Sequence, residues 1–498
     1  MSRPVASRLV AGCLLVTLAP ACALAGSALG IDGNVRLPNP FSGDGQYGYG
    51  MTAGDFDGDG VRDLAVARNG GIDVRVLLGQ TWVVGAPGPV MKFSASSFDA
   101  GTGFNASTLV SGDFNGDGRD ELAFGNPSYS ASVPSGGRAY VAQRSAGGVW
   151  SIAETIQQGS NGYAGAHEAG DKFGSALAVG DFDNDGYEDL AISALDEAVG
   201  TTTGAGAVLI AYGSATGITS ARDHLVTRDN DGLTFTPGVD DNYGWSLASG
   251  DFDADGYADL AIGAVGALCP DGTTHGGAVI VMYGSASGLS NTRTKIFRRG
   301  VNGMAGTCTG GELFGMKMVA AGFDGGLTSD LAIGSYSDGV HVLYSDANGL
   351  ATAGDQHFTT TNVPGATSDS NFGSQLAAGR LRSNSATPLF GGASLVIGAP
   401  QDDVDGFDKA GSVTVLHATG SGLKAASAER WTRKASLVIG APAAEDRFGS
   451  ALAVGDFNDD GAGDLAIGVP NYDSGSTVDD GAAVVLYGSE FIFRDGFE

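Results

Sequence analysis

Five segments of the chain carry oxygen-bearing side chains at one fixed spacing. In the segment from Asp181 to Asp189, carboxylates stand at positions 1, 3, 5 and 9, Gly186 at position 6 permits a tight turn, and Tyr187 at position 7 offers its carbonyl. A hard cation such as Ca²⁺ takes six to eight oxygen ligands at about 2.3–2.6 Å, and this spacing wraps oxygens around one point. The segment therefore predicts a calcium-binding loop.

The same spacing recurs in four other segments, so that about five calcium sites are expected. Three of the loops bring four carboxylates each, whereas the loops that start at Asp113 and Asp456 have Asn at position 3 and bring three. The expected ligands, with position 7 contributing its backbone carbonyl, are Asp55, Asp57, Asp59, Val61 and Asp63; Asp113, Asn115, Asp117, Arg119 and Glu121; Asp181, Asp183, Asp185, Tyr187 and Asp189; Asp251, Asp253, Asp255, Tyr257 and Asp259; Asp456, Asn458, Asp460, Ala462 and Asp464.

Two further loops have lost most of these acids. In one, Gly322 and Gly326 replace two acids and leave Asp324 and Asp330. In the other, positions 1, 3 and 5 hold Arg380, Arg382 and Asn384. Two cationic side chains are incompatible with a bound Ca²⁺, so that no calcium is expected there, and an arginine in the place of the cation is an open alternative.

Neither an EF-hand nor a tandem calcium motif fits the spacing of the five loops. An EF-hand would continue to Glu at position 12, but that position in the loop from Asp181 is Ile192, inside an expected strand. Tandem nonapeptide and dockerin-type motifs pack their calcium loops close together, whereas these loops are far apart in the sequence. A solvated Asp-Gly turn remains the alternative for any one loop. Crowded carboxylates repel without a cation, so that five loops of one spacing favour calcium.

The loops lie inside a repeat that predicts the fold. The segment FGSALAVGDFDNDGYEDLAIS, which starts at Phe173, returns almost unchanged at Phe448. In all, the chain contains seven copies of this repeat, at intervals of 58 to 76 residues. Each has an apolar run, the loop, a short run such as LAIG, a third strand such as GAVLIAYGS (206–214) and a weaker fourth. Such a four-stranded antiparallel unit must stack on its neighbours to bury both faces. The expected fold is all-β, a seven-bladed β-propeller.

The aromatic-Gly start, the DxDxDGxxD loop and Gly398-Ala399-Pro400 after a second strand resemble FG-GAP repeats, over roughly residues 31–489. These repeats build the seven-bladed propeller at the N-terminus of integrin α chains and occur in many exported bacterial proteins. The resemblance implies that the segment 31–41 takes the place of the closing strand, at the outer edge of the last blade. Propellers are platforms, so that function must be argued from sites.

Residues 1–25 are expected to be a signal peptide. They have a basic start, an apolar stretch and the cleavage pattern Ala23-Leu24-Ala25, although a buried N-terminal helix is an alternative. The propeller is then expected over 26–489 and a short tail over 490–498. The protein is expected to be exported, as a secreted, periplasmic or cell-surface protein. No other stretch is apolar enough to span a membrane.

Cleavage leaves two cysteines, Cys269 and Cys308, which in an exported protein are expected to form a disulfide. Two separate thiols are the alternative. Each cysteine lies in a connection on the face opposite the calcium loops. That face is also the expected ligand face, because its connections differ from blade to blade. The candidate contacts there are Tyr129, Tyr336, Tyr472, Asp402, Asp403 and Asp405. A structural role, in which they cover the loops beneath them, is the alternative for each.

Composition and motifs argue against several classes of function. The chain of 498 residues has a formal net charge of −29, which argues against nucleic acid as a partner. The six His are scattered singly, and there is no HExxH motif, no Walker loop and no GxSxG with a plausible triad. We therefore expect a non-enzymatic binding or adhesion platform for an extracellular protein or glycan. A polysaccharide hydrolase or lyase with its site in the axial funnel and a surface assembly component are the alternatives.

Overall fold

The computed structural model describes residues 35–40, 45–69, 74–79, 108–130, 133–230, 236–336, 338–367, 371–381, 391–433, 440–473 and 478–488. All the regular secondary structure in these ranges consists of β-strands, which confirms the predicted all-β class. Several predicted features lie outside the described residues, namely the signal peptide 1–25, the tail 490–498, both ends of the closing segment (31–34 and 41), Arg382 and Asn384.

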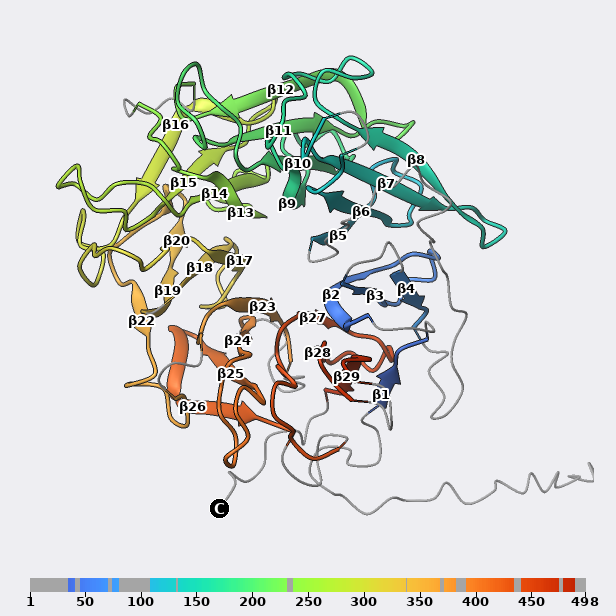
Figure 1. Cartoon of the computed structure of the whole chain (residues 1–498), viewed down its shortest axis with the longest axis vertical. Helices are drawn as coiled ribbons and strands as arrows, with labels where there is room; N and C mark the ends of the chain where they lie inside the picture. Colours follow the sequence, from blue (N-terminus) through green and yellow to red (C-terminus); the bar gives the residue numbers. More distant parts are fainter. Residues whose placement is uncertain are drawn as a thin grey trace, which may run out of the picture.

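The strands form seven antiparallel sheets in a ring, as Figure 1 shows, and the predicted seven-bladed propeller is confirmed. Blade 1 consists of β2 (Tyr47–Gly54), β3 (Asp63–Arg68) and β4 (Val74–Leu77); blade 2 of β5 (Leu109–Gly112), β6 (Glu121–Asn126), β7 (Arg138–Arg144) and β8 (Trp150–Ile156); blade 3 of β9 (Phe173–Gly180), β10 (Asp189–Ala194), β11 (Ala207–Tyr212) and β12 (Thr219–Thr227); blade 4 of β13 (Tyr243–Gly250), β14 (Asp259–Ala264), β15 (Ala278–Tyr283) and β16 (Ser290–Phe297).

Blades 5 to 7 continue the ring. Blade 5 consists of β17 (Lys317–Ala321), β18 (Asp330–Ser335), β19 (Gly339–Leu343) and β22 (Gln356–Phe358), with the small hairpin β20 (Ser345–Asp346) and β21 (Gly349–Leu350) between the last two; blade 6 of β23 (Gln375–Gly379), β24 (Ser394–Ala399), β25 (Ser412–Thr419) and β26 (Gly422–Trp431); blade 7 of β27 (Leu452–Gly455), β28 (Asp464–Val469), β29 (Ala482–Leu486) and β1 (Val35–Pro38). In blade 1, three strands fall within the described residues.

The two ends of the propeller share one sheet. β1 pairs antiparallel with β29, with Val35 opposite Val485 and Pro38 opposite Ala482, and so forms the outer strand of blade 7. Figure 1 shows β1 beside β29, next to blade 1. Leu37 of β1 is buried in the same apolar cluster as Tyr47 of blade 1. The N-terminal strand therefore takes the outer position that the resemblance implied for the segment 31–41.

The core lies between the blades. The second strand of blade 3, β10, is buried at all six residues, and the second strand of blade 4, β14, shows the same pattern. Both faces of these strands are covered by the neighbouring blades, which is why short apolar runs such as DLAIS replace the alternation of a half-exposed strand. Apolar clusters join each sheet to its neighbour, as Leu260 of blade 4 does when it packs with Val208 of blade 3.

The antiparallel order fixes two faces of the ring. The acid-rich loops join first to second strands and lie on one face, called here the Asp-loop face; the connections from second to third strands lie on the other, the connection face. On the connection face a disulfide joins Cys269 to Cys308, with a Cα–Cα distance of 5.8 Å. Gly276 packs so closely against this bond that a Cβ there would collide with both sulfur atoms. Within the described ranges we find no helix long and apolar enough to cross a membrane.

Candidate metal centres

The backbone of each acid-rich loop folds around its first acid. In blade 3 the two carboxylate oxygens of Asp181 accept hydrogen bonds from the N–H groups of Asp185 and Gly186, at 3.0 and 2.9 Å. Asn184 at position 4 has a φ of 53°, and Gly186 at position 6 has a φ of 92°. Positions 4 and 6 are thus both left-handed, which favours the Gly found at position 6 of all five loops and the Gly, Asn or Asp found at position 4 of four of them, whereas blade 4 has Ala254 there. The tight turn brings the side chains of positions 1, 3 and 5 to one side.

Position 9 has a structural task that the spacing does not reveal. The Oδ2 of Asp189 accepts the N–H of Phe182, and its Oδ1 accepts the N–H of Gly213 at the end of the third strand, both at 2.9 Å. The carboxylate therefore ties the loop to two strands of its own blade. Burial raises the pKa of Asp189 to about 8. Burial likewise raises the pKa of the equivalent acids, to about 7 for Asp63, Asp259 and Asp464, about 8 for Glu121 and about 6 for Asp330.

Three loops gather carboxylate oxygens closely enough to hold a metal ion. In each group the oxygens lie within 4.8 Å of one another, and the groups are Asp55, Asp57 and Asp63 of blade 1, Asp181, Asp183 and Asp189 of blade 3, and Asp251, Asp253 and Asp255 of blade 4. The Oδ1 atoms of Asp57 and Asp183 are buried and have no hydrogen-bond partner. A buried, unpaired carboxylate oxygen in an all-oxygen cluster fits a hard divalent cation.

In the loops of blades 2 and 7, the Asn at position 3 forms hydrogen bonds within its own loop. The Oδ1 of Asn115 accepts the N–H of Asp117 at 2.9 Å, and its amide donates to Glu121 at 2.5 Å. In blade 7 Asn458 accepts the N–H of Asp460 at 3.1 Å. Among the described residues these loops form no three-carboxylate group as close as the other three. They hold the predicted ligands in the same order but with one acid fewer.

The two degenerate loops, in blades 5 and 6, lack several of the acids that the other five loops carry. In blade 5 Asp324 accepts the N–H of Gly326 at 2.7 Å, while Asp330 ties Phe323 to Ser345 as the other position-9 acids do. In blade 6 the Arg380 side chain lines a cavity near the ring axis. Arg382 and Asn384 lie outside the described residues, and the alternative that an arginine occupies the place of the cation stays a prediction.

Two histidines that appear isolated in the sequence meet in blade 5. His341 of β19 lies opposite His357 of β22, and their rings stack with centroids 4.0 Å apart and planes 12° apart. The Oδ2 of Asp338 lies 3.2 Å from the Nε2 of His341 and 2.9 Å from the Nε2 of His357. The Arg299 guanidinium lies 2.6 Å from the same oxygen. The expectation that all six histidines are scattered singly is wrong for this pair.

The stacked geometry indicates charge compensation rather than metal binding. Imidazole lone pairs lie in the ring planes, and two nearly parallel planes do not converge on one ion. Burial lowers the pKa of His341. For His357, burial is outweighed by hydrogen bonds to Asp338, which raise its pKa. Despite burial, both histidines and Arg299 hold the pKa of Asp338 below its usual range.

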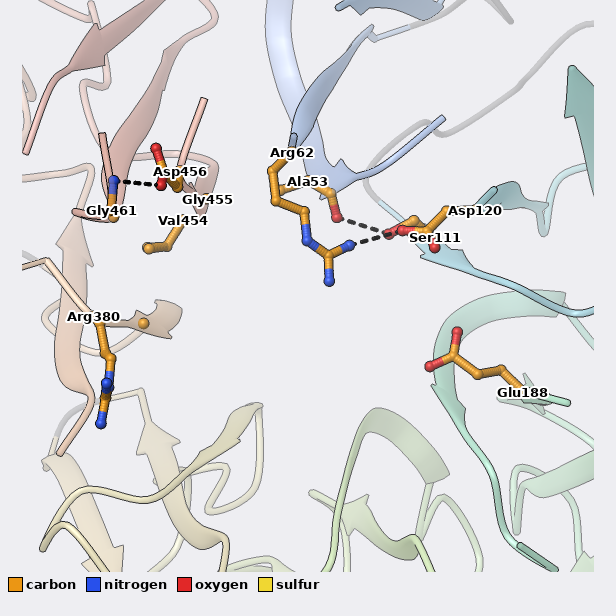
Figure 2. A pocket seen from close by; sticks show the side chains of 12 residues that line it. Ala53, Arg62, Ser111, Asp120, Glu188, Arg380, Val454, Gly455, Asp456 and Gly461 are labelled. Carbon is orange, nitrogen blue, oxygen red and sulfur yellow. Dashed lines mark hydrogen bonds and ion pairs between the residues drawn. The ribbon is translucent and has the colours of Figure 1, made fainter. Parts of the chain in front are cut away.

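A cavity of about 540 Å³ lies between the loops of blades 1, 2, 3, 6 and 7 on the Asp-loop face. Figure 2 shows Arg62 and Asp120 joined at its edge, with Glu188 and Arg380 on other sides. Arg62 donates to Asp120 at 2.8 Å. The Asp120 carboxylate also accepts the N–H of Asp55, and Glu188 accepts the N–H of Asp113. Asp120 and Glu188, two of the three acids that line the cavity, are therefore engaged with neighbouring loops.

The candidate ligand contacts on the connection face differ in how far they are exposed. Tyr129 is 1% exposed beneath the Arg138 guanidinium, and Asp402 is buried against Arg430, so that both serve the fold. Tyr472 lies between the guanidinium groups of Arg36 and Arg433, with its hydroxyl 2.6 Å from Arg36. The exposed candidates are Tyr336, at 47%, Asp403 and Asp405.

Comparison with known proteins agrees with this architecture. A model of the FG-GAP repeat matches residues 105–142, 173–210, 243–282 and 448–486. Phosphatidylinositol-glycan-specific phospholipase D of Rattus norvegicus is 33% identical over 176 residues, which cover 35% of this chain and 20% of the relative. Integrin alpha-V of Gallus gallus is 30% identical over 234 residues, which cover 45% of this chain and 20% of the relative. The chain thus spans about a fifth of the length of these curated relatives.

Among solved structures, a chain from the crystal structure of BBS1N in complex with ARL6DN, soaked with mercury, aligns with a TM-score of 0.44 and 11% identity, over 91% of this chain and 96% of that chain. The repeats, the ring of seven sheets and the integrin relatives agree with one another. The chain thus carries four matches to the FG-GAP repeat within a seven-bladed β-propeller that is similar to integrin alpha chains.

Proposed function

We propose that this propeller is a calcium-dependent, non-enzymatic platform that binds a protein or glycan partner outside the cell. The observation that carries the calcium part is the buried, unpaired Oδ1 of Asp57 and of Asp183, each inside a cluster of carboxylate oxygens. An unpaired buried acceptor costs folding free energy, and a cation at that point removes the cost.

In this proposal the ion is held in each of five loops by the side chains of positions 1, 3, 5 and 9 and the carbonyl of position 7. Calcium supplies positive charge, which offsets the mutual repulsion of the carboxylates. The all-oxygen donor set favours Ca²⁺ over softer metals, because cysteine and histidine are absent from these loops. Position 9 keeps its hydrogen bonds to the strands, so that ion binding stiffens the whole blade.

The partner site is proposed on the connection face. The Asp-loop face repeats one design around the ring, whereas the connections vary in length and sequence, as a tailored binding site requires. Tyr336 offers an exposed aromatic surface at small entropic cost, and Asp403 and Asp405 place exposed acidic side chains on another blade. Export and an extracellular location are part of the same proposal, in keeping with the disulfide.

An enzymatic function is the second candidate, because a phospholipase D is among the similar proteins. Of the acids near the ring axis, Asp120 and Glu188 already accept hydrogen bonds from the backbone of adjacent loops. Their first task is therefore structural. Turnover of a glycosylated phosphatidylinositol or of a polysaccharide by the purified full chain would replace the binding platform with an enzyme.

The test is capture of partners from surface extracts and on glycan panels, in millimolar Ca²⁺ and in chelator. We expect partners that depend on calcium. The variant Tyr336→Ala on the connection face is compared with Leu327→Ala, which removes a 99% exposed side chain from the Asp-loop face of the same blade. Loss of binding in Tyr336→Ala alone supports the proposed face, and loss in Leu327→Ala alone contradicts it.

A further inference from the structure

An arginine from the outer strand reaches the calcium loop of blade 3. The Nη2 of Arg222, in β12, lies 2.6 Å from the Oδ2 of Asp183 at loop position 3. Its guanidinium carbon lies 4.5 Å from the ring centroid of Tyr212, so that the cation is held over an aromatic face. The other oxygen of Asp183, Oδ1, is the buried atom without a hydrogen-bond partner. Arg222 therefore occupies one carboxylate oxygen and leaves the other available.

Blade 4 repeats the arginine at the equivalent position, and there the other oxygen of Asp253, Oδ1, accepts the N–H of Asp255 at 3.3 Å. Arg293, in β16, forms ion pairs with Asp253 and, at 3.3 Å, with Asp255, and its guanidinium carbon lies 4.8 Å from the ring centroid of Tyr283. Strand register shows the equivalence. Arg222 stands two residues before His224, which pairs with Ile210, and Arg293 stands two residues before Lys295, which pairs with Val281.

Blade 2 lacks both members of the pair. Its loop has Asn115 at position 3, and its outer strand has Ile152 two residues before Glu154, the partner of Val141. Blade 7 also has Asn at position 3, while the outer-strand positions of blade 1 and blade 7 that would face their loops lie outside the described residues. Among the acid-rich loops whose outer strand is described, an acid at position 3 occurs with an arginine in blades 3 and 4, and an amide occurs without one in blade 2. The degenerate loop of blade 5 keeps Asp324 at position 3 but has Gly354 two residues before Gln356, the partner of Val342.

We propose that Arg222 and Arg293 are outer-sphere charge partners of the calcium loops in blades 3 and 4. Each binds one oxygen of the position-3 carboxylate, leaves the other oxygen to the ion and cancels the fourth negative charge of its loop. A four-acid loop then presents to calcium the net charge of a three-acid loop. The inference rests on the proposed calcium binding and adds positioning residues that the loop motif does not contain.

The proposal predicts that the arginine contributes more to stability in the ion-free protein than in the ion-bound protein. Without an ion, Arg222 is the only cation among the described residues that forms an ion pair with Asp183, so that its loss leaves four crowded carboxylates. With an ion bound, the added positive charge makes the guanidinium less important. Arg222→Met keeps an apolar stem over Tyr212 and removes the charge. The double variant Asp183→Asn with Arg222→Ile reproduces the residue pair of blade 2.

The experiment measures the melting temperature of the full chain in chelator and in millimolar Ca²⁺. We expect Arg222→Met to melt lower in chelator and nearly as wild type in calcium, so that the calcium-induced rise grows by roughly 2 °C. We expect the double variant to restore the wild-type rise. An equal loss in both conditions would make the pair a structural ion pair only, and no change in either condition would also overturn the inference.

The two proposals fail in different ways. If the wild-type chain shows neither a calcium-induced rise nor a heat of calcium binding by calorimetry, the calcium function itself is wrong. If the wild-type chain shows both, and Arg222→Met shows the same rise as wild type, only the role of the arginine is wrong. Arg293→Met, in a separate blade, provides an independent repetition.

Discussion

Asp120 of blade 2 accepts a hydrogen bond from the backbone N–H of Asp55, the first acid of the loop in blade 1, at 3.0 Å. Asp120 stands at loop position 8, and its own N–H donates to the carbonyl of Asp55 at 2.7 Å. The backbone bond recurs around the ring, from Ser329 to Asp251 and from Gly463 to Arg380, both at 2.7 Å. The loops of blades 2, 3, 4, 5 and 7 are thus each clamped to the loop of the preceding blade.

Removing a side chain from this clamp is expected to destabilise the ring. Glu188 at position 8 of blade 3 accepts the N–H of Asp113 at 2.8 Å, and Glu188→Ala leaves that donor without a charged acceptor. We expect a loss of about 1–2 kcal/mol in the free energy of unfolding, measured by denaturant titration. Glu168→Ala, which removes an exposed acid on the connection face, is the control. Equal stability of the two variants would show that the side-chain contact contributes nothing.

Closure by the N-terminal strand makes a second prediction. Leu37 of β1 is 6% exposed and packs with residues of blades 1 and 7. Leu37→Ala should lower the free energy of unfolding by about 2–3 kcal/mol, because it opens a cavity at the seam of the ring. Val149→Ala changes a 68% exposed side chain in blade 2 and should change it by less than about 0.5 kcal/mol. Similar values for the two variants would show that β1 is not needed for closure.

The disulfide is expected to stabilise the junction of blades 4 and 5. Its loop spans a sequence separation of 39, for which loop-closure entropy predicts about 4 kcal/mol. The double variant Cys269→Ala with Cys308→Ala should therefore melt clearly lower than wild type, and a reducing agent should lower the melting temperature of the wild type alone. A reducing agent with no effect on the wild-type melt would contradict the prediction.

A pH dependence follows from Glu197, which lies far from the acid-rich loops on the connection face. Its Oε2 accepts the Nε2 of Gln158 at 2.9 Å, and burial raises its pKa to about 7. Because the folded state holds this proton more tightly than the unfolded chain, the stability it contributes is complete below about pH 4 and is lost as the pH rises through about 7.

Glu197→Gln removes this titration while keeping the shape of the side chain. Relative to wild type, the variant should therefore gain stability as the pH rises from 5 to 8, at no more than about 1.4 kcal/mol per pH unit. Chemical denaturation at several pH values in chelator measures the difference. A difference between variant and wild type that is constant with pH would show that Glu197 is ionised throughout.

The sequence predicts the propeller well because both signals it relies on are local. The seven copies show strand, loop and strand in order, and the carboxylates of a loop such as Asp181 to Asp189 are brought together by one turn. The structural task of position 9 is hidden, because a ligand and a hydrogen-bond acceptor need the same carboxylate at the same place. Asp330, which persists in a loop that has lost the acids at positions 1 and 5, is the signal that a structural role exists.

Contacts between strands cannot be predicted from such local sequence patterns. His341 and His357 meet only because β19 pairs with β22 in one register, and Arg222 reaches Asp183 across a blade. The burial of Tyr129 depends on Arg138, whose guanidinium covers the ring at 3.8 Å. A single sequence shows none of these partners. The acid at position 3 and the arginine of the outer strand become a pattern only when blades 2, 3 and 4 are compared in space.

The most direct test of the central claim is the melting temperature of the full wild-type chain, measured in chelator and again in millimolar Ca²⁺. Extracellular-type sites with dissociation constants of about 10⁻⁴–10⁻³ M contribute roughly 1 kcal/mol each at this concentration. Five such sites predict a clear rise in melting temperature with calcium. An identical melting temperature in chelator and in calcium would contradict the assignment of the acid-rich loops as calcium sites.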